Sequence, residues 1–183
     1  MIRAIRRCGF LAFLCTAFVA AGPAFAADVN IAAFFGHWKG SALSESEISI
    51  HFQLTQRDID VRVGPAGNDG FRITWATVQR QKGDPNMPEE VLKETTVDFQ
   101  PNGRPGVWVG KAGDPLTTGE ISWARVAERT LTIYNMGIRD DGAYDMQIYK
   151  RTLTGSGMEL EFTRTIDGGV TRTAKGRLIK FSN

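Results

Sequence analysis

The chain has 183 residues, of which 42% are hydrophobic and 23% are charged, with 20 glycines and 7 prolines along its length. This composition excludes a collagen, a coiled coil and bulk disorder, and the length fits one globular domain behind a short leader. The 22 basic residues stand against 20 acidic ones, for a formal net charge of +2.

Residues 1–26 have the arrangement of a secretory signal peptide. Arg3, Arg6 and Arg7 precede an apolar run over 8–21, and a small-residue cleavage pattern ends at Ala26. We therefore expect export, to the periplasm if the source is a Gram-negative bacterium and by secretion otherwise, and a single mature domain over 27–183. The apolar run is shorter than the roughly 20 residues that span a bilayer, so we predict no transmembrane helix.

Cleavage of this leader would change the chemistry of the chain. Loss of its three arginines would leave 19 basic residues against 20 acidic ones, without a basic cluster, so we predict no nucleic-acid partner. Cys8 and Cys15 both lie in the leader. The mature domain would therefore have no disulfide, no thiol nucleophile and no thiolate metal site.

After the leader, the first predicted element is a short helix over 31–35, with Asp28 or Asn30 as its N-cap and Gly36 at its end. A first strand opens at Gly36, and the segment Ala42 to Glu47 predicts a tight turn. The clearest alternation of apolar and polar residues covers 48–55, which predicts a strand, and the polar residues 56–58 predict the turn after it.

The remainder of the chain reads as further strands. Apolar residues alternate with polar ones in the segments 59–63, 71–75, 91–99, 107–109, 121–123, 131–133, 144–148, 158–162 and 170–181. Short Gly/Asn/Asp turns at 67–70, 140–142, 155–157 and 167–169 are typical of β-hairpins, and longer connections cover 81–88 and 111–119.

About ten half-polar strands joined by hairpins need closure to remove their exposed edges. The pattern therefore predicts an all-β fold, an antiparallel up-and-down β-barrel of about 8–10 strands with one short N-terminal helix. A β-sandwich is the alternative.

The opening Gly36-His37-Trp38-Lys39-Gly40 resembles the start of the calycins, the superfamily of lipocalins, fatty-acid-binding proteins and avidins. The resemblance implies that Gly36 and Trp38 close one end of a barrel, and that Trp38 packs beneath an arginine of the last strand. Arg177 is the matching position, ahead of Arg172.

The compact opening is also similar to the ten-stranded nitrobindin-type barrels, which hold haem through a histidine late in the chain. No histidine follows His51, so haem ligation does not carry over, and we predict no cofactor.

Residue types that carry out catalysis are few and isolated. His37 and His51 lie on polar strand faces without a second histidine or a carboxylate pair at ligand spacing, and Ser156 lies in a hairpin turn. The acidic segment 140–145 lacks the spacing of a calcium loop. The sequence thus predicts neither a catalytic residue nor a metal site, and a non-enzymatic function is favoured over an enzymatic one.

The candidate ligand-binding residues are aromatic or basic. Arg125 and Lys150 each continue an apolar alternation, as does Arg164, and Trp75, Trp108 and Trp123 come from separate strands. Rings around an apolar cavity with basic groups at its edge would hold a carboxylate or phosphate head group. The alternative interpretation is that the rings fill a core and the cations cover its rim.

The sequence therefore favours an exported soluble barrel that binds a small, largely apolar or amphipathic ligand, with an anionic ligand as the refinement that the cations suggest. The main alternative is a non-catalytic envelope interaction or structural protein with a packed barrel, whose protein partner the sequence does not name. An outer-membrane barrel is a lesser alternative.

Overall fold

The computed structural model describes residues 28–49, 54–80 and 90–182. Within these ranges the chain forms ten strands and two short helical segments. In chain order these are η1 (Ile31–Phe34), β1 (Gly36–Ser46), β2 (Leu54–Ala66), β3 (Gly70–Arg80), β4 (Glu90–Pro101), β5 (Val107–Val109), α1 (Pro115–Thr118), β6 (Glu120–Ala127), β7 (Thr130–Ile138), β8 (Tyr144–Thr154), β9 (Gly157–Ile166) and β10 (Gly169–Ser182).

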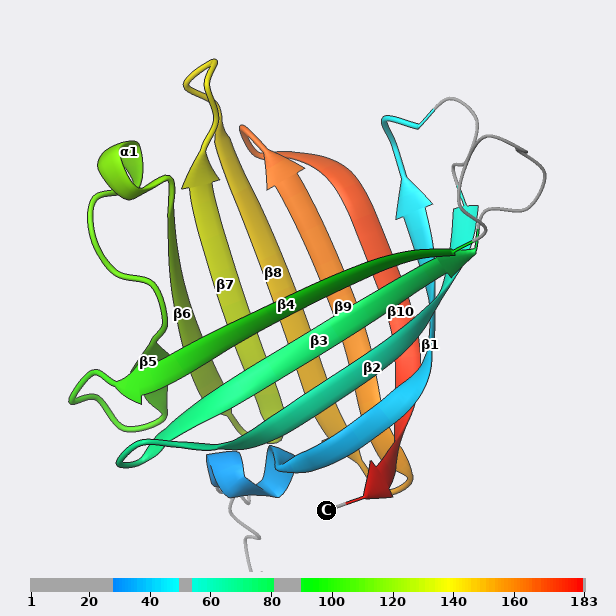
Figure 1. Ribbon diagram of the computed structural model, residues 1–183, viewed down its shortest axis with the longest axis vertical. Helices are drawn as coiled ribbons and strands as arrows, with labels where there is room; N and C mark the ends of the chain where they lie inside the picture. The colour runs from blue at the N-terminus through cyan, green and yellow to red at the C-terminus, as the bar shows by residue number, and fades with distance from the viewer. Residues whose placement is uncertain (1–27, 50–53, 81–89, 183) are drawn as a thin grey trace, which may run out of the picture.

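The strands form one closed antiparallel barrel (Figure 1). Each strand pairs with the next one along the chain, and β1 pairs with β10 to close the sheet. Closure leaves no free edge except beside the three-residue strand β5, whose ladder to β4 is short. The prediction of an all-β up-and-down barrel is confirmed, and the sandwich alternative is wrong.

The predicted N-terminal helix is present as η1. It covers the end of the barrel that is lower in Figure 1. The side chain of Asn30 caps η1 by accepting a hydrogen bond of 2.9 Å from the backbone N–H of Ala32. Phe34 is fully buried, and the indole Nε1 of Trp38 donates to its carbonyl oxygen at 2.9 Å. Trp38 is thus buried and held against η1 at this end of the barrel.

Gly40 is required where β1 meets β10. A Cβ atom at Gly40 would lie 2.0 Å from the backbone oxygen of Arg177, which is far inside van der Waals contact. Gly176 is in a similar position, 2.5 Å from the backbone oxygen of Ser41. The second glycine of the opening motif therefore allows the first and last strands to approach closely enough to close the sheet.

The lower half of the barrel is packed with apolar side chains. Phe71 and Phe99 stack with ring centroids 4.9 Å apart, and both are fully buried. Around them lie Val61, Val63, Ile73, Val97, Leu131, Ile133, Met158 and Leu178. This half provides the hydrophobic core, so the stability of the fold does not depend on filling the upper half.

The first hairpin differs from its prediction. Strand β1 continues to Ser46, so the tight turn expected over 42–47 is wrong, and residues 56–58 lie inside β2. Ile48 and Ser49 lie outside a strand, and residues 50–53 are outside the described residues. The 56–58 error has a physical cause: polar residues suggested a turn, but the side chain of Arg57 points into the barrel.

Two further segments also need comment. The connection at 111–119 contains the short helix α1, where the Asp114 side chain accepts from the backbone N–H of Leu116 at 3.0 Å. The predicted leader, 1–26, and the predicted loop at 81–88 are outside the described residues.

Candidate ligand-binding cavity

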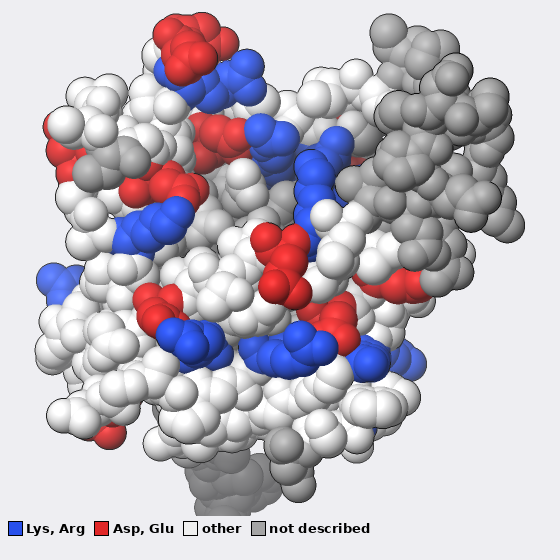
Figure 2. Space-filling model, in the orientation of Figure 1, with Lys and Arg blue, Asp and Glu red and all other residues white. Residues whose placement is uncertain are grey.

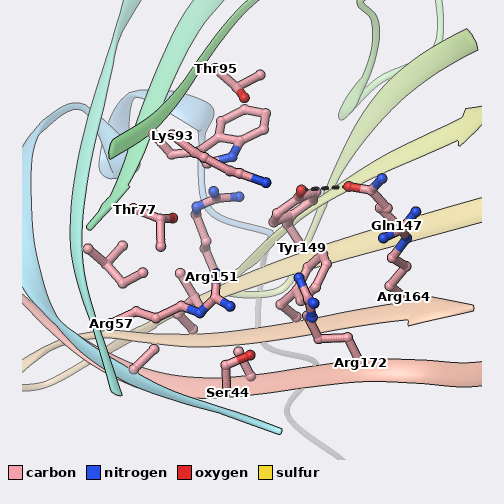
Figure 3. Close-up of a pocket in the computed structure, with 16 residues that line it drawn as sticks. Ser44, Arg57, Thr77, Lys93, Thr95, Gln147, Tyr149, Arg151, Arg164 and Arg172 are labelled. Carbon is pink, nitrogen blue, oxygen red and sulfur yellow. Dashed lines mark hydrogen bonds between the residues drawn. The ribbon is translucent and has the colours of Figure 1, made fainter. Parts of the chain in front are cut away.

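The upper half of the barrel contains a cavity of about 300 Å³ (Figure 3). Its walls come from β1, β2, β3, β4, β8, β9 and β10, so it lies inside the closed sheet. The space exists because the inward positions of β1 and β10 carry small side chains at this level. Ala42, Ser44 and Ala174 are among them, and Ala174 pairs in register with Ser44 on one side and Phe162 on the other.

An aromatic cluster forms the apolar part of the cavity. The rings of Trp75 and Tyr149 are 5.1 Å apart, and those of Tyr149 and Phe162 are 4.8 Å apart. The Tyr149 hydroxyl donates to the Gln147 side-chain oxygen at 2.9 Å. Burial raises the pKa of Tyr149, so its hydroxyl is neutral at neutral pH and keeps the proton that it donates to Gln147.

Five cationic side chains line the same cavity: Arg57, Lys93, Arg151, Arg164 and Arg172. Arg164 is neutralised, because its Nε donates to both carboxylate oxygens of Asp145 at 3.0 Å, and this hydrogen bonding raises the pKa of Arg164. Among the described residues, no carboxylate forms an ion pair with the other four. The cavity is therefore strongly positive.

Arg151 is the most unusual of these residues because its side chain is fully buried. Its guanidinium carbon lies 5.5 Å from the ring centroid of Trp75 and 5.6 Å from that of Tyr149. Its Nε and Nη1 have no hydrogen-bond partner among the described residues. Burial lowers the pKa of Arg151 to about 10, so it is still protonated at neutral pH.

Arg57 and Arg172 form a second group of cations. Both are half-buried, and they project inward from β2 and β10, the two strands that flank β1. The Nε of Arg57 makes a long hydrogen bond of 3.4 Å to the Thr55 hydroxyl. Burial and, after it, the positive charge of Arg172 lower the pKa of Arg57, so the two guanidinium groups repel each other.

The surface outside the cavity has a different distribution of charge. Figure 2 shows basic and acidic groups interspersed over the face formed by β2, β3 and β4. Arg72 on this face donates to Asp98 at 2.6 Å from its Nε. On this face the charge of Arg72 is therefore paired, in contrast to the four cavity cations that have no carboxylate partner among the described residues.

Of the three predicted tryptophans, the structure places Trp75 in the cavity and the other two elsewhere. Trp108 is buried in the lower half, where its Nε1 donates to the backbone oxygen of Asp69 at 3.0 Å. Trp123 lies on the outer face and stacks on Tyr134, with ring centroids 4.9 Å apart. The predicted aromatic lining is therefore not brought together as a set.

Arg125 and Lys150 are exposed on the outer face of the barrel. They flank Thr132 in register, and this threonine is buried beneath them although it points outward. Strand β6 turns Ser122, Ala124 and Val126 inward, so the prediction that Trp123 and Arg125 face the interior is wrong. Strand β8 turns Tyr149 and Arg151 inward, so the prediction that Lys150 faces the interior is wrong as well.

The predicted contact between Arg177 and Trp38 is also wrong. Arg177 is exposed on the outer face and donates to Glu159 at 3.5 Å. Alternation along β10 turns Leu178 and Lys180 inward instead, and the Lys180 ammonium lies 5.6 Å from the Trp38 ring centroid. Gly36 has a φ of +128°, and a Cβ there would lie 2.6 Å from Cε of Lys180, so Gly36 makes room for this contact.

The candidate site therefore depends on residues that the sequence did not assign to ligand binding, chiefly Arg57, Tyr149, Arg151 and Arg172. A signal for them exists in β8, where Gln147, Tyr149 and Arg151 alternate on one face. That face was set aside because the opposite one, with Met146 and Ile148, is more apolar. In a hollow barrel the more polar face can be the inner one.

The histidines and the helices add no further site in the part of the chain that the structure describes. His37 bonds through Nε2 to Asp60 at 2.8 Å on the outer face, and His51 is outside the described residues. No described helix is long and apolar enough to cross a membrane. In the described ranges, no group of three or more His, Cys, Asp or Glu side chains is placed to hold a metal ion.

Comparison with solved structures finds a protein of similar fold. The chain is similar to the S-type phycobiliprotein lyase CPES from Guillardia theta, with a TM-score of 0.55 over 85% of this chain and 94% of that one. The likeness supports the barrel fold that the sequence predicted. The two sequences are only 10% identical, so the likeness concerns the fold. No protein-family model matches the chain, and no curated protein matches it in sequence.

Proposed function

We propose that this barrel binds a small amphipathic anion in its upper cavity. The apolar body of the ligand would lie against Trp75, Tyr149 and Phe162, and its carboxylate, phosphate or sulfonate would be held by Arg151. The observation that carries the proposal is the buried guanidinium of Arg151, which lines the cavity. Two of its nitrogens, Nε and Nη1, have no hydrogen-bond partner among the described residues.

The energetic argument concerns the empty site. A buried charge without a partner costs several kcal/mol, and aromatic faces return only about 0.5–2 kcal/mol each. An anion would supply both the countercharge and the missing acceptors, and Arg is suited to such planar groups because it donates through two nitrogens at once. The positive cavity is thus better matched to an anion than to a neutral apolar ligand.

The cavity also separates this proposal from the packed-scaffold alternative. A volume of about 300 Å³ lies at the lower end of the range for small-molecule sites. A purely structural barrel gains nothing from a hollow interior lined by unpaired arginines, because apolar side chains would fill the same space more stably. We also propose that the protein binds its ligand in the periplasm, since residues 1–26 have the pattern of a signal peptide.

The similar solved barrel is named as a phycobiliprotein lyase, but its activity is not needed for this proposal. What the fold contributes is a closed sheet with room inside one half. The ligand class comes from the cationic and aromatic residues of this chain.

The experiment is a fluorescence titration of the purified domain with anilinonaphthalene sulfonate, a probe with an aromatic body and one anionic group. We expect saturable binding that Arg151→Met weakens by about a hundredfold, a loss of roughly 2.7 kcal/mol. The control is the double variant Arg125→Met/Lys150→Met, which removes two cations from the outer face and should bind as wild type does. Binding that follows the outer pair instead would overturn the proposal in favour of the residues predicted from sequence.

A further inference from the structure

The outer face of β5, β6, β7 and β8 carries two rows of apolar side chains that lie in register across the sheet. The first row consists of Val109, Trp123, Tyr134 and Ile148. The second row consists of Ile121, Met136 and Met146. All of these side chains are half-buried, so each one still presents part of its surface to solvent. Neither row contains a charged residue, unlike the face of β2, β3 and β4 in Figure 2.

The proposed function does not account for these two rows. Ala124 and Ile133 are fully buried in the core, so alternation turns their strand neighbours Trp123 and Tyr134 outward. None of the side chains in the two rows lines the cavity. A contiguous apolar patch on the outside of a soluble domain is typical of an interaction surface.

The row below the apolar rows is positively charged. Arg125 and Lys150 lie in it on either side of Thr132, and neither forms an ion pair with a described residue. Glu161 continues the row, but it lies in register between Lys150 and Lys175. The net charge of this row is therefore positive.

The opposite end of the same strands is acidic. The β7–β8 hairpin is the highest point of the barrel in Figure 1, and its turn carries the exposed residues Asp140 and Asp141. Arg139 lies 3.5 Å from Asp141, and Asp140 has no ion pair among the described residues. The face thus has a basic end, an apolar centre and an acidic end.

This charge order makes the face complementary to a second copy of itself. Lys150 and the acidic turn are about 30 Å apart along the hairpin, at about 3.3 Å per residue, and the midpoint lies next to Met146. A two-fold axis in the plane of the face, crossing the strands at Met146, would place the basic row of each copy against the acidic turn of the other. An axis parallel to the strands would bring like charges together instead.

We propose that two copies of this chain associate through this face, in the orientation that pairs the basic row with the acidic turn. The strands β5 to β9 are about 20 Å wide together, so each copy would bury up to about 600 Å². A total of about 1,200 Å² is the lower limit for a specific interface, so we expect dissociation in the micromolar range. This inference is independent of the proposed function, because the cavity is lined by other residues.

The test is sedimentation equilibrium of the purified protein from about 1 µM to about 200 µM, where a monomer–dimer equilibrium is expected. Met136→Lys places a charge in the apolar centre and should weaken the dimer at least about tenfold. The matched control is Thr96→Lys on the outer face of β4, which should leave the equilibrium unchanged. A wild-type protein that is monomeric at every concentration would overturn the proposal. Binding of that monomer to phosphatidylcholine vesicles would assign the face to lipid instead.

Two further variants test the orientation. Lys150→Glu and Asp140→Lys should each weaken the dimer by about tenfold, and the double variant should restore it to within about threefold of wild type. In a Cys8→Ser/Cys15→Ser background, Met146→Cys should form a disulfide-linked dimer on oxidation, whereas Thr96→Cys should not. A dimer that the double variant does not restore, or that Met146→Cys does not cross-link, would contradict the proposed packing. The cavity titration with anilinonaphthalene sulfonate should be the same in all of these variants, so failure here leaves the proposed function intact.

Discussion

The guanidinium carbon of Arg151 lies 5.5 Å from the ring centroid of Trp75, although the two residues leave strands on opposite walls of the barrel. Together with Tyr149, they extend across the interior at the boundary between its two halves. Below them the barrel is packed with apolar side chains, and above them it is hollow. The Arg151–Trp75 contact thus lies between the core and the cavity, and Arg151 is the best candidate for recognising a ligand.

Replacing Arg151 by methionine should stabilise the empty protein. The folded-state pKa of about 10 lies well below the ordinary value of an arginine, so burial destabilises the folded protein by roughly 3 kcal/mol at pH 7. Loss of two cation–π contacts of about 0.5–2 kcal/mol each offsets part of the gain. Urea unfolding should show a net increase of up to about 2 kcal/mol.

The stability gain of Arg151→Met should depend on pH, with a sign that follows from the same pKa of Arg151. The unfolded chain binds the Arg151 proton more tightly than the folded one, so the penalty is complete below a pH of about 10 and disappears as the pH rises towards the ordinary pKa of an arginine. The stability difference between Arg151→Met and wild type should therefore shrink over this window. A variant that is less stable than wild type at pH 7 would show that the contacts of Arg151 outweigh its desolvation.

Anion binding should weaken at alkaline pH. In the empty cavity Arg151 loses its proton as the pH rises through about 10, and only the protonated side chain attracts an anion. Titrations with anilinonaphthalene sulfonate should cover about pH 8 to about pH 11, one unit or more on each side of this pKa. The affinity should be constant at the lower pH values and fall steeply at the higher ones. An affinity that stays level throughout would mean that Arg151 is not the anion-binding group.

Filling the cavity should abolish binding at little cost to the fold. Ala174→Leu places a larger side chain between Phe162 and Ser44, in space that the packed lower half does not use. We expect the probe to bind at least tenfold more weakly, with stability changed by less than about 1 kcal/mol. Lys175→Leu, one residue along and exposed on the outer face, is the matched control and should leave binding unchanged.

Closure of the barrel should depend on Gly40. Gly40→Ala would place a Cβ 2.0 Å from the Arg177 backbone oxygen, which forces β1 away from β10. We expect a loss of about 3 kcal/mol or more in thermal unfolding. Gly64→Ala in β2 meets no atom within 4 Å and should change stability by less than about 1 kcal/mol. Similar effects of the two substitutions would show that the close approach is not needed.

Much of the architecture is readable from local sequence. Alternation with period two, Gly/Asn/Asp turns and the Asn30 cap of η1 are properties of neighbouring residues, and they predicted an up-and-down barrel of about 8–10 strands with an N-terminal helix. The segment from Gly36 to Gly40 likewise marked the start of β1. The strand limits near 42–58 were missed because polar residues that face a cavity resemble those of a turn.

The binding site is a different matter, because alternation shows that a strand has two faces but not which face is inside. For β3 and β9 the more apolar face is the inner one, so Trp75 and Arg164 were placed correctly. For β6 and β8 the more apolar face is outside, so Arg125 and Lys150 were chosen where Arg151 belongs. The sequence by itself determined the strands and their order. Only the closed barrel decided which side chains meet across its interior, because burial is set by strands far apart in the chain.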